Sequence, residues 1–197
     1  MGTRERILDA TAEVMSTLGL ANTTTKQIAR AAGYSEATLY KHFRDKTELF
    51  LSTLAERLPS FVALLTGLPE RAGQGTVQHN LEETARAALT FFQDVFPMAA
   101  ALFAEPELLA AHREMLRQRG GGPHCANEAL AAYLRAERDL GGVAADVDPE
   151  AAAAMLLGAC FQHAFLSHFT GAPGRESTGD LAAALAATLA RALNARH

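Results

Sequence analysis

Apolar residues recur every three or four positions along most of the chain, which is the period of an amphipathic helix. The first such segment runs from residue 4 to residue 18 and places Ile7, Ala10, Val14 and Leu18 on one face. Gly19 then follows as a stop signal. No segment alternates apolar and polar residues as a half-buried strand would. The pattern therefore predicts an all-α protein.

Two short helices joined by a tight turn are predicted next. Thr24 and Gln27 have the spacing of a capping box, so the first of these helices begins there and ends at Gly33. Ser35 caps the second, which runs to about His42. Two helices joined by a short Gly-containing turn form the smallest unit that lays one helix into the DNA major groove. This segment therefore predicts a DNA-binding helix-turn-helix.

A third helix is predicted to start at Lys46, where Asp45 and Glu48 form a second capping box. With it, the segment resembles the DNA-binding domain of the TetR family of bacterial transcriptional regulators. The resemblance rests on IA-x-x-AG at Ile28 to Gly33, Tyr34 and Ser35, TLYKHF at Thr38 to Phe43, Lys46 and Leu49. It covers roughly residues 3 to 50, and beyond them only length and helical character match the family.

The resemblance implies two domains. Residues 1–47 are expected to form a three-helix helix-turn-helix DNA-binding domain, and residues 48–197 a helical ligand-binding and dimerisation domain. The candidate DNA contacts are exposed positions of the predicted helices or the residues that cap them. They are Thr25, Lys26, Ser35, Glu36, Ala37, Thr38, Tyr40, Lys41, His42 and Lys46.

These candidates divide into base and phosphate contacts. Ala37 and Thr38 are small and lie near the start of the second helix, where base edges approach closely. Glu36 can accept from a cytosine amine, but its charge also suits the first turn of a helix. The remaining candidates with cationic, hydroxyl or ring side chains are expected to contact phosphates. The resemblance implies such contacts for Tyr40, His42 and Lys46. The places of Thr25, Lys26 and Lys41 on the predicted helices indicate the same role for these residues.

The charge is distributed unevenly along the chain. The net charge is −4, but residues 1–50 carry a net +1 and residues 51–197 a net −5. All three lysines, Lys26, Lys41 and Lys46, lie in the first part, where phosphates would be met. No apolar run looks long enough to span a bilayer, and two cysteines are too few for a disulfide scaffold. We therefore expect a cytoplasmic protein that does not span a membrane.

Two C-terminal helices, at residues 149–170 and 180–194, are expected to form a homodimer interface. Small residues line the first, and the second carries leucines at four-residue intervals from Leu181 to Leu193. An intramolecular core is the alternative for any single leucine. A helix-turn-helix needs two copies to read two half-sites, and the resemblance also implies dimerisation through these helices.

Aromatic residues and methionines gather around Pro97, where we expect a break in the helices, and on the 149–170 helix. Such side chains with few polar neighbours suit an apolar small molecule, although core packing explains each of them as well. The resemblance implies that some of them line a pocket. The candidates are Phe91, Phe92, Phe96, Phe103, Met115, Tyr133, Gln162, His163 and Phe165.

Metal and catalytic sites are not expected. Cys160 and His163 share a helical face, but His168 falls well round from them, and a further ligand such as His112 or His124 would be needed. The sequence has neither a phosphate-binding glycine loop after a strand nor a Gly-x-Ser-x-Gly elbow. We therefore expect no cofactor and no enzyme activity.

The sequence predicts a homodimeric, ligand-responsive repressor of the TetR type. It would bind a palindromic double-stranded DNA operator and be released by a small apolar molecule. Two alternatives stay open: an effector-independent regulator or activator, and an all-helical ligand-binding protein whose DNA-binding motif is vestigial.

Overall fold

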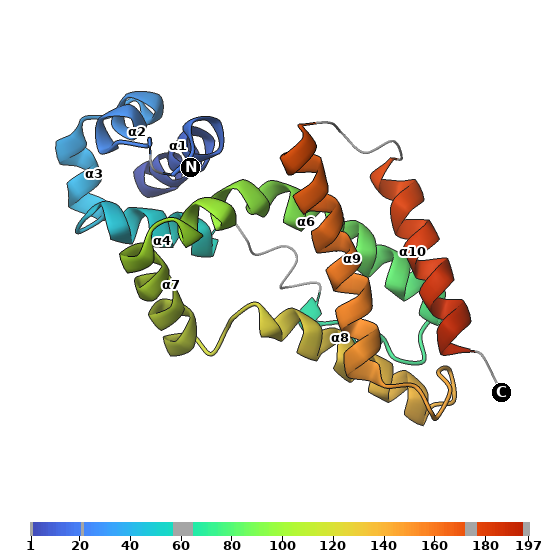
Figure 1. Ribbon diagram of the computed structural model, residues 1–197. Coiled ribbons are helices and arrows are strands. Elements are labelled where there is room, and N and C mark those ends of the chain that lie inside the picture. Colours follow the sequence, from blue (N-terminus) through green and yellow to red (C-terminus); the bar gives the residue numbers. More distant parts are fainter. Residues whose placement is uncertain (1, 21, 57–64, 172–176, 195–197) are drawn as a thin grey trace. The chain divides into compact units, whose positions relative to one another are not determined.

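All secondary structure in the described part of the chain is helical, as predicted (Figure 1). The computed structural model describes residues 2–20, 22–56, 65–171 and 177–194. The elements are α1 (Thr3–Leu18), α2 (Thr25–Ala32), α3 (Glu36–His42), α4 (Lys46–Glu56), the short 3-10 helix η1 (Pro69–Arg71), α6 (Val77–Phe103), α7 (Pro106–Gln118), α8 (His124–Asp139), α9 (Pro149–Thr170) and α10 (Thr178–Leu193).

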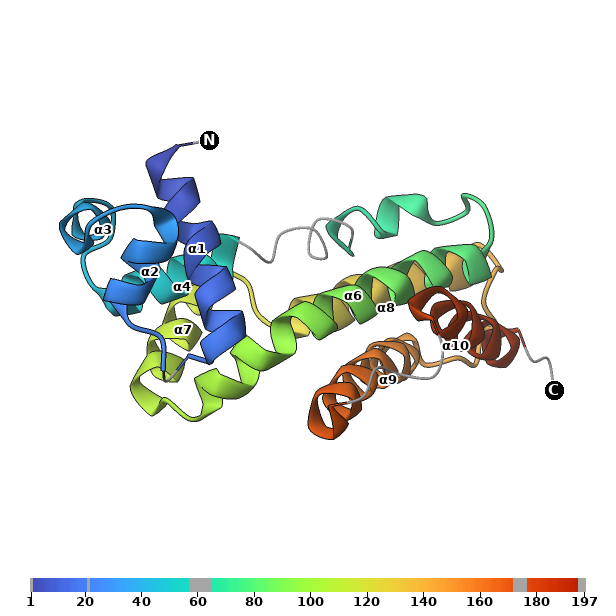
Figure 2. The same cartoon turned by 90° about the horizontal axis from the view of Figure 1, so that it is seen from above.

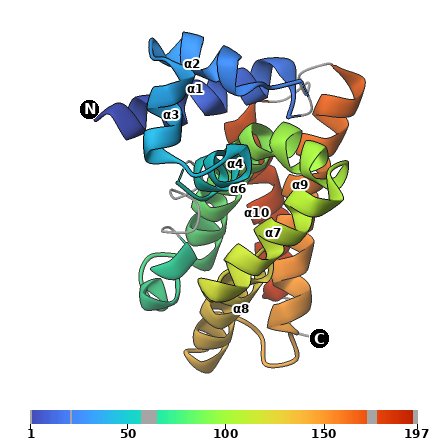
Figure 3. The ribbon, with the colours of Figure 1, turned by 90° about the vertical axis from the view of Figure 1, so that its left-hand side faces the viewer.

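The chain forms two compact units. The first comprises Met1–Pro59 and Pro97–Gly120, and in it α1 packs against α2 and α4, α2 against α3, and α4 against α7. Figure 3 shows how α3 follows α2 across a short turn. Its core contains Ile7, Leu8, Met15, Ile28, Leu39, Phe43, Leu49, Phe50, Leu54 and Leu102. The predicted boundary after residue 47 falls inside α4, so the functional division into 1–47 and 48–197 stays a prediction.

The second unit comprises Ser60–Phe96 and Gly121–His197. Its core joins the first part of α6 with α8, α9 and α10. The helices α9 and α10 lie side by side (Figures 1 and 2). A buried polar chain also crosses this core, in which Asn80 Nδ2 donates to the Tyr133 hydroxyl and to the Gln74 carbonyl, both at 3.0 Å. Because their hydrogen bonds are satisfied, these polar groups can be buried at little cost.

The expected break around Pro97 is wrong. Helix α6 runs through the proline without interruption from Val77 to Phe103. A proline inside a helix has no N–H to donate to the carbonyl four residues earlier, which here belongs to Gln93. That carbonyl oxygen is 2.9 Å from Nε2 of His168 on α9. The neighbouring helix therefore supplies a partner for the group that the proline leaves without one.

Helix α9 also corrects the expectation about apolar runs. Its 22 residues are long and apolar enough to cross a membrane by length and composition alone, with a mean hydropathy of 1.2 over the most apolar window. One third of that window, 33%, is buried inside the protein. Exposed apolar side chains on such a helix also fit a protein interface, so its composition does not decide between the two.

Candidate functional site

Helix α3 has a fixed buried face and a free outer face. The Ser35 hydroxyl accepts from the Thr38 N–H at 3.2 Å and caps the helix, as predicted. Gly33 ends α2 in the left-handed conformation, at φ 75°, which a glycine adopts without strain. Leu39 and Phe43 are buried in the core of the first unit. This packing leaves the opposite face of α3 accessible, with Glu36, Ala37, Tyr40, Lys41 and His42 exposed and Thr38 half-buried.

The start of α2 is tied to the start of α3. The predicted capping box is present, with the Gln27 N–H donating to the Thr24 hydroxyl at 3.2 Å and the Thr24 N–H to the Gln27 side chain at 2.8 Å. The next residue, Thr25, donates from its hydroxyl to Glu36 Oε1 at 2.6 Å. Two predicted DNA contacts therefore bond each other across the first turns of both helices.

A second cap opens α4 and places Lys46. The Glu48 N–H donates to Asp45 Oδ1 at 2.8 Å, as expected for a capping box. The Glu48 carboxylate accepts in return from the Arg44 N–H at 2.6 Å, one residue before the position that a strict box uses. The Lys46 ammonium lies 5.0 Å from the centre of the Phe50 ring, and the side chain is exposed. The lysine is thus held beside the helix N-terminus, where phosphate oxygens bind well.

The sequence did not predict that Arg4 links helices of the first unit. Its guanidinium donates to both carboxylate oxygens of Glu56, at 2.6 and 2.5 Å, and lies 5.3 Å from the centre of the Phe43 ring. Arg4 therefore connects α1 with the end of α4 and with the residue that ends α3. The hydrogen bond to Glu56 raises the pKa of Arg4. Nothing in the local pattern indicates a pair that lies 52 residues apart in sequence.

The predicted effector residues are only partly brought together. Phe91, Phe92, Phe96 and Phe165 join one aromatic cluster, with Phe161 and Phe169, and its neighbouring ring centroids lie 5.3 to 5.9 Å apart. Two further candidates lie on α9, where Gln162 is exposed and His163 half-buried.

Three other candidates make no ring contact with this cluster among the described residues. Tyr133 is fully buried, which raises the pKa of its hydroxyl, and that hydroxyl accepts from Asn80. Phe103, which is exposed, and Met115, which is half-buried, belong to the first unit. An effector site built from all nine candidates therefore stays a prediction.

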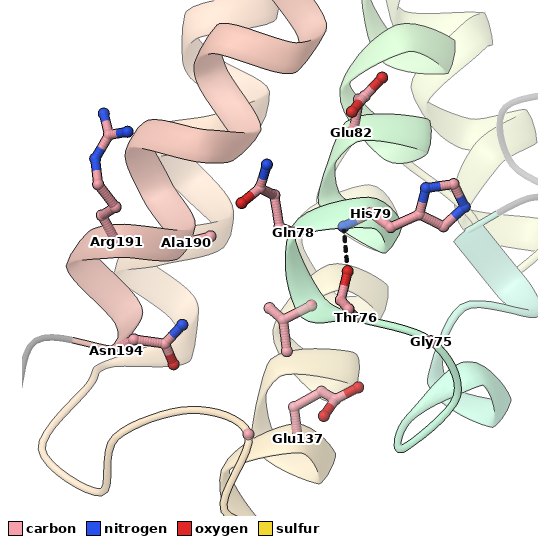
Figure 4. Close-up of a pocket in the computed structure, with 11 residues that line it drawn as sticks. Gly75, Thr76, Gln78, His79, Glu82, Glu137, Ala190, Arg191 and Asn194 are labelled. Carbon is pink, nitrogen blue, oxygen red and sulfur yellow. Dashed lines mark hydrogen bonds between the residues drawn. The ribbon is translucent and has the colours of Figure 1, made fainter.

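A cavity of about 860 Å³ lies elsewhere in the second unit, and polar and apolar atoms line it in nearly equal parts. Figure 4 shows that its residues come from the start of α6, the end of α8 and the end of α10. They include Gln78, His79, Glu82, Glu137, Arg191 and Asn194. None of the predicted effector residues lines it. The cavity therefore does not coincide with the predicted effector site, which stays a prediction.

Two side chains of α9 that could have bound a metal, Cys160 and His168, make other contacts. Cys160 is fully buried, its Sγ is 3.8 Å from the Ala85 carbonyl oxygen, and burial raises the pKa of its thiol to about 12. The His168 ring stacks on Phe96, with ring centroids 5.5 Å apart, while its Nε2 binds Gln93. A buried protonated thiol is a poor metal ligand, so Cys160 does not suit a metal site on α9.

Comparison with known proteins agrees with this geometry. The family described as "Bacterial regulatory proteins, tetR family" matches residues 7–53. The regulator SrpR of Pseudomonas putida is 44% identical over 55 residues, which are 28% of this chain and 26% of SrpR. The chain thus spans about a quarter of that relative.

Solved structures match over nearly the whole chain. A TetR transcription regulator from Haloarcula marismortui is 20% identical, with a TM-score of 0.74 over 97% of both chains. The regulator FadR from Bacillus subtilis, solved in complex with stearoyl-CoA, is 17% identical, with a TM-score of 0.70 over 98% of this chain and 99% of that one. At such identities the likeness shows a shared fold.

Proposed function

We propose that the chain is a transcriptional repressor of the tetR family, which a small apolar molecule releases from a palindromic operator. The description of that family matches residues 7–53. The observation that carries this proposal is the outer face of α3. This face is held in place by the Ser35 cap and by the buried side chains of Leu39 and Phe43. The relatives of known role that the chain resembles are regulators rather than enzymes.

DNA binding divides into the two kinds of contact expected from the sequence. The exposed lysines Lys26, Lys41 and Lys46 contact phosphates and supply affinity that falls with salt. Side chains of the first turn of α3 contact base edges and supply sequence preference. Ala37 and Thr38 meet base edges directly, and Glu36 does so while it accepts from Thr25.

Dimerisation uses α9 and α10. A row of exposed apolar side chains follows the outer face of α9, from Met155 through Phe161 and Phe165 to Phe169. Met155 is 67% exposed and Phe169 78%. An exposed apolar row of this length is uncommon on a monomer and fits a protein interface. Two copies joined here would present two α3 helices. A palindromic operator requires two such helices, because its half-sites lie one DNA turn apart.

The effector is proposed to contact the aromatic cluster of Phe91, Phe92, Phe96 and Phe165. Aromatic rings with few polar neighbours favour an apolar ligand. The likeness to FadR, which was solved with stearoyl-CoA, supports an acyl chain as one class to test. In one conformation of the dimer, the two α3 helices are too far apart to reach both half-sites. A ligand that binds this conformation more tightly lowers the affinity for DNA by linkage. Such a regulator acts on the chromosome, so we place it in the cytoplasm.

Footprinting tests the proposal. The purified protein is titrated onto the DNA that flanks its own gene, with scrambled DNA of equal length as the control. Protection of a palindrome at nanomolar protein supports a sequence-specific regulator and supplies the operator on which acyl compounds can be tested for release. Equal and weak binding to both DNAs, repeated in a genome-wide pull-down, contradicts sequence-specific regulation.

A further inference from the structure

Three side chains of types that can bind metals lie close together at the start of α8. They are His124, Cys125 and Glu128, and one imidazole nitrogen, the thiol sulfur and one carboxylate oxygen all lie within 4.8 Å of one another. Among the residues that the structure describes, this is the one group of three His, Cys, Asp or Glu side chains with such an arrangement. The sequence alone drew attention only to His124, as a distant helper of Cys160.

We propose that His124, Cys125 and Glu128 bind a divalent transition metal of the Zn²⁺ type. Nitrogen, sulfur and oxygen donors at this spacing match the donors that Zn²⁺ takes in proteins. In a tetrahedral site with metal–ligand distances of about 2.0–2.3 Å, neighbouring donors lie roughly 3.3–3.8 Å apart. The donors of this group, which lie within 4.8 Å of one another, therefore need to approach by at most about 1–1.5 Å, which side-chain rotation can supply.

The charge and the coordination number also fit. A thiolate and a carboxylate together neutralise a divalent ion, and a neutral imidazole completes three ligands. Three protein ligands leave one position for water or for a ligand from outside. His124 and Glu128 are exposed and Cys125 is half-buried, so an ion reaches the group from solvent.

The backbone before α8 helps to place the imidazole. A Cβ on Gly122 would lie 2.7 Å from Cε1 and 2.8 Å from Nδ1 of His124. The ring thus packs directly over the glycine, and any side chain at position 122 would displace it. Because the displaced atoms belong to a flexible side chain, Gly122→Ala should move His124 without unfolding the helix.

The chain contains a matched comparison for this group. His79 and Glu83 have the same spacing as His124 and Glu128, four residues apart on a helix, with Nε2 and Oε1 3.6 Å apart. Among the described residues, no cysteine lies beside them to complete a group of three possible metal ligands, as Cys125 does at α8. The pair should therefore behave as an ordinary ion pair.

Cobalt is the probe that tests the site, because a cysteine thiolate bound to Co²⁺ gives a charge-transfer absorption band and tetrahedral Co²⁺ gives intense visible bands. The full-length, reduced protein is stripped with a chelator and titrated with Co²⁺, and Zn²⁺ is then added in competition. We expect one Co²⁺ per chain, both sets of bands, and their loss on adding Zn²⁺.

Four variants locate the ion. Cys125→Ser should remove the charge-transfer band and weaken binding by at least about 100-fold, while Glu128→Gln and Gly122→Ala should weaken it by about tenfold. His79→Ala should change nothing. The proposal is overturned if no thiolate band appears, if the band survives in Cys125→Ser, or if His79→Ala weakens binding as much as Gly122→Ala does. Circular dichroism of each variant checks that the helices are intact.

Discussion

Replacing Glu36 with alanine should weaken operator binding and abolish the preference for one base pair. Glu36 lies in the first turn of α3, and its Oε1 accepts from the Thr25 hydroxyl at 2.6 Å. The other oxygen, Oε2, is then the atom available to a base edge. A carboxylate close to DNA is repelled by phosphates unless it accepts from an amine, and the cytosine amine offers such a donor in the major groove.

The magnitude follows from the number of bonds. A bidentate contact to a base is worth about 1–3 kcal/mol of discrimination, and Glu36 has one oxygen left for it, so we expect about 1–2 kcal/mol. This corresponds to a roughly 5- to 30-fold loss of preference at one position. Thr25→Val removes a hydrogen bond of about 0.5–1.5 kcal/mol and should reduce the same preference by a smaller factor.

The assay is fluorescence anisotropy at constant salt, on four operators that differ at one base pair. If Thr25 also contacts a phosphate, Thr25→Val lowers the affinity for all four operators by the same factor. Only the loss of affinity that differs between the operators then acts through Glu36. In the double variant, Thr25→Val should cause no further loss of preference. Equally tighter binding of Glu36→Ala to all four operators would refute a base contact by Glu36, because the carboxylate would then only be repelled by DNA.

Three further predictions concern phosphates, dimerisation and pH. Lys46→Ala should weaken binding to every DNA and reduce the magnitude of the slope of log affinity against log salt by about 1. Thr38→Ala should instead change the sequence preference and leave that slope unaltered. Salt titrations of both variants measure the two slopes. Met155→Glu should dissociate the dimer in light scattering, while Leu140→Glu, at 64% exposure against 67%, should leave it intact. The raised pKa of Cys160, about 12, contributes stability that is complete below the pKa of an unfolded thiol and is lost as the pH rises above it. Above about pH 9, urea titrations should show the wild type losing stability faster than Cys160→Ala, by up to about 1.4 kcal/mol per pH unit.

Local signals predicted much of the first unit because its helices begin and end through contacts between near neighbours. The Thr24 box, the Ser35 cap and the left-handed Gly33 each involve residues at most five apart, and all are present. The bond between Thr25 and Glu36 escaped prediction because it depends on how two helices pack. The pair of Arg4 and Glu56 escaped for the same reason at a larger separation.

The second unit was less predictable. Helix periodicity correctly located α9 and α10, but it does not tell which aromatic residues face a core, a ligand or a second subunit. Tyr133 shows the difficulty, since its hydroxyl belongs to a buried chain of hydrogen bonds that only the fold assembles. At α8, one turn of helix brings His124 and Glu128 together, but Cys125 joins them only through the orientation of its side chain.

The proline in α6 makes two distant positions depend on each other in evolution. Because Pro97 leaves the Gln93 carbonyl without its helical donor, His168 fills a need that the proline itself creates. The carbonyl can only accept, so Nε2 must carry the hydrogen, and the tautomer of His168 is decided from another helix. A chain with alanine at position 97 would close its own helical bond and could lose the histidine at little cost. Substitutions at the two positions should therefore be epistatic, and homologues without the proline are free to vary the histidine.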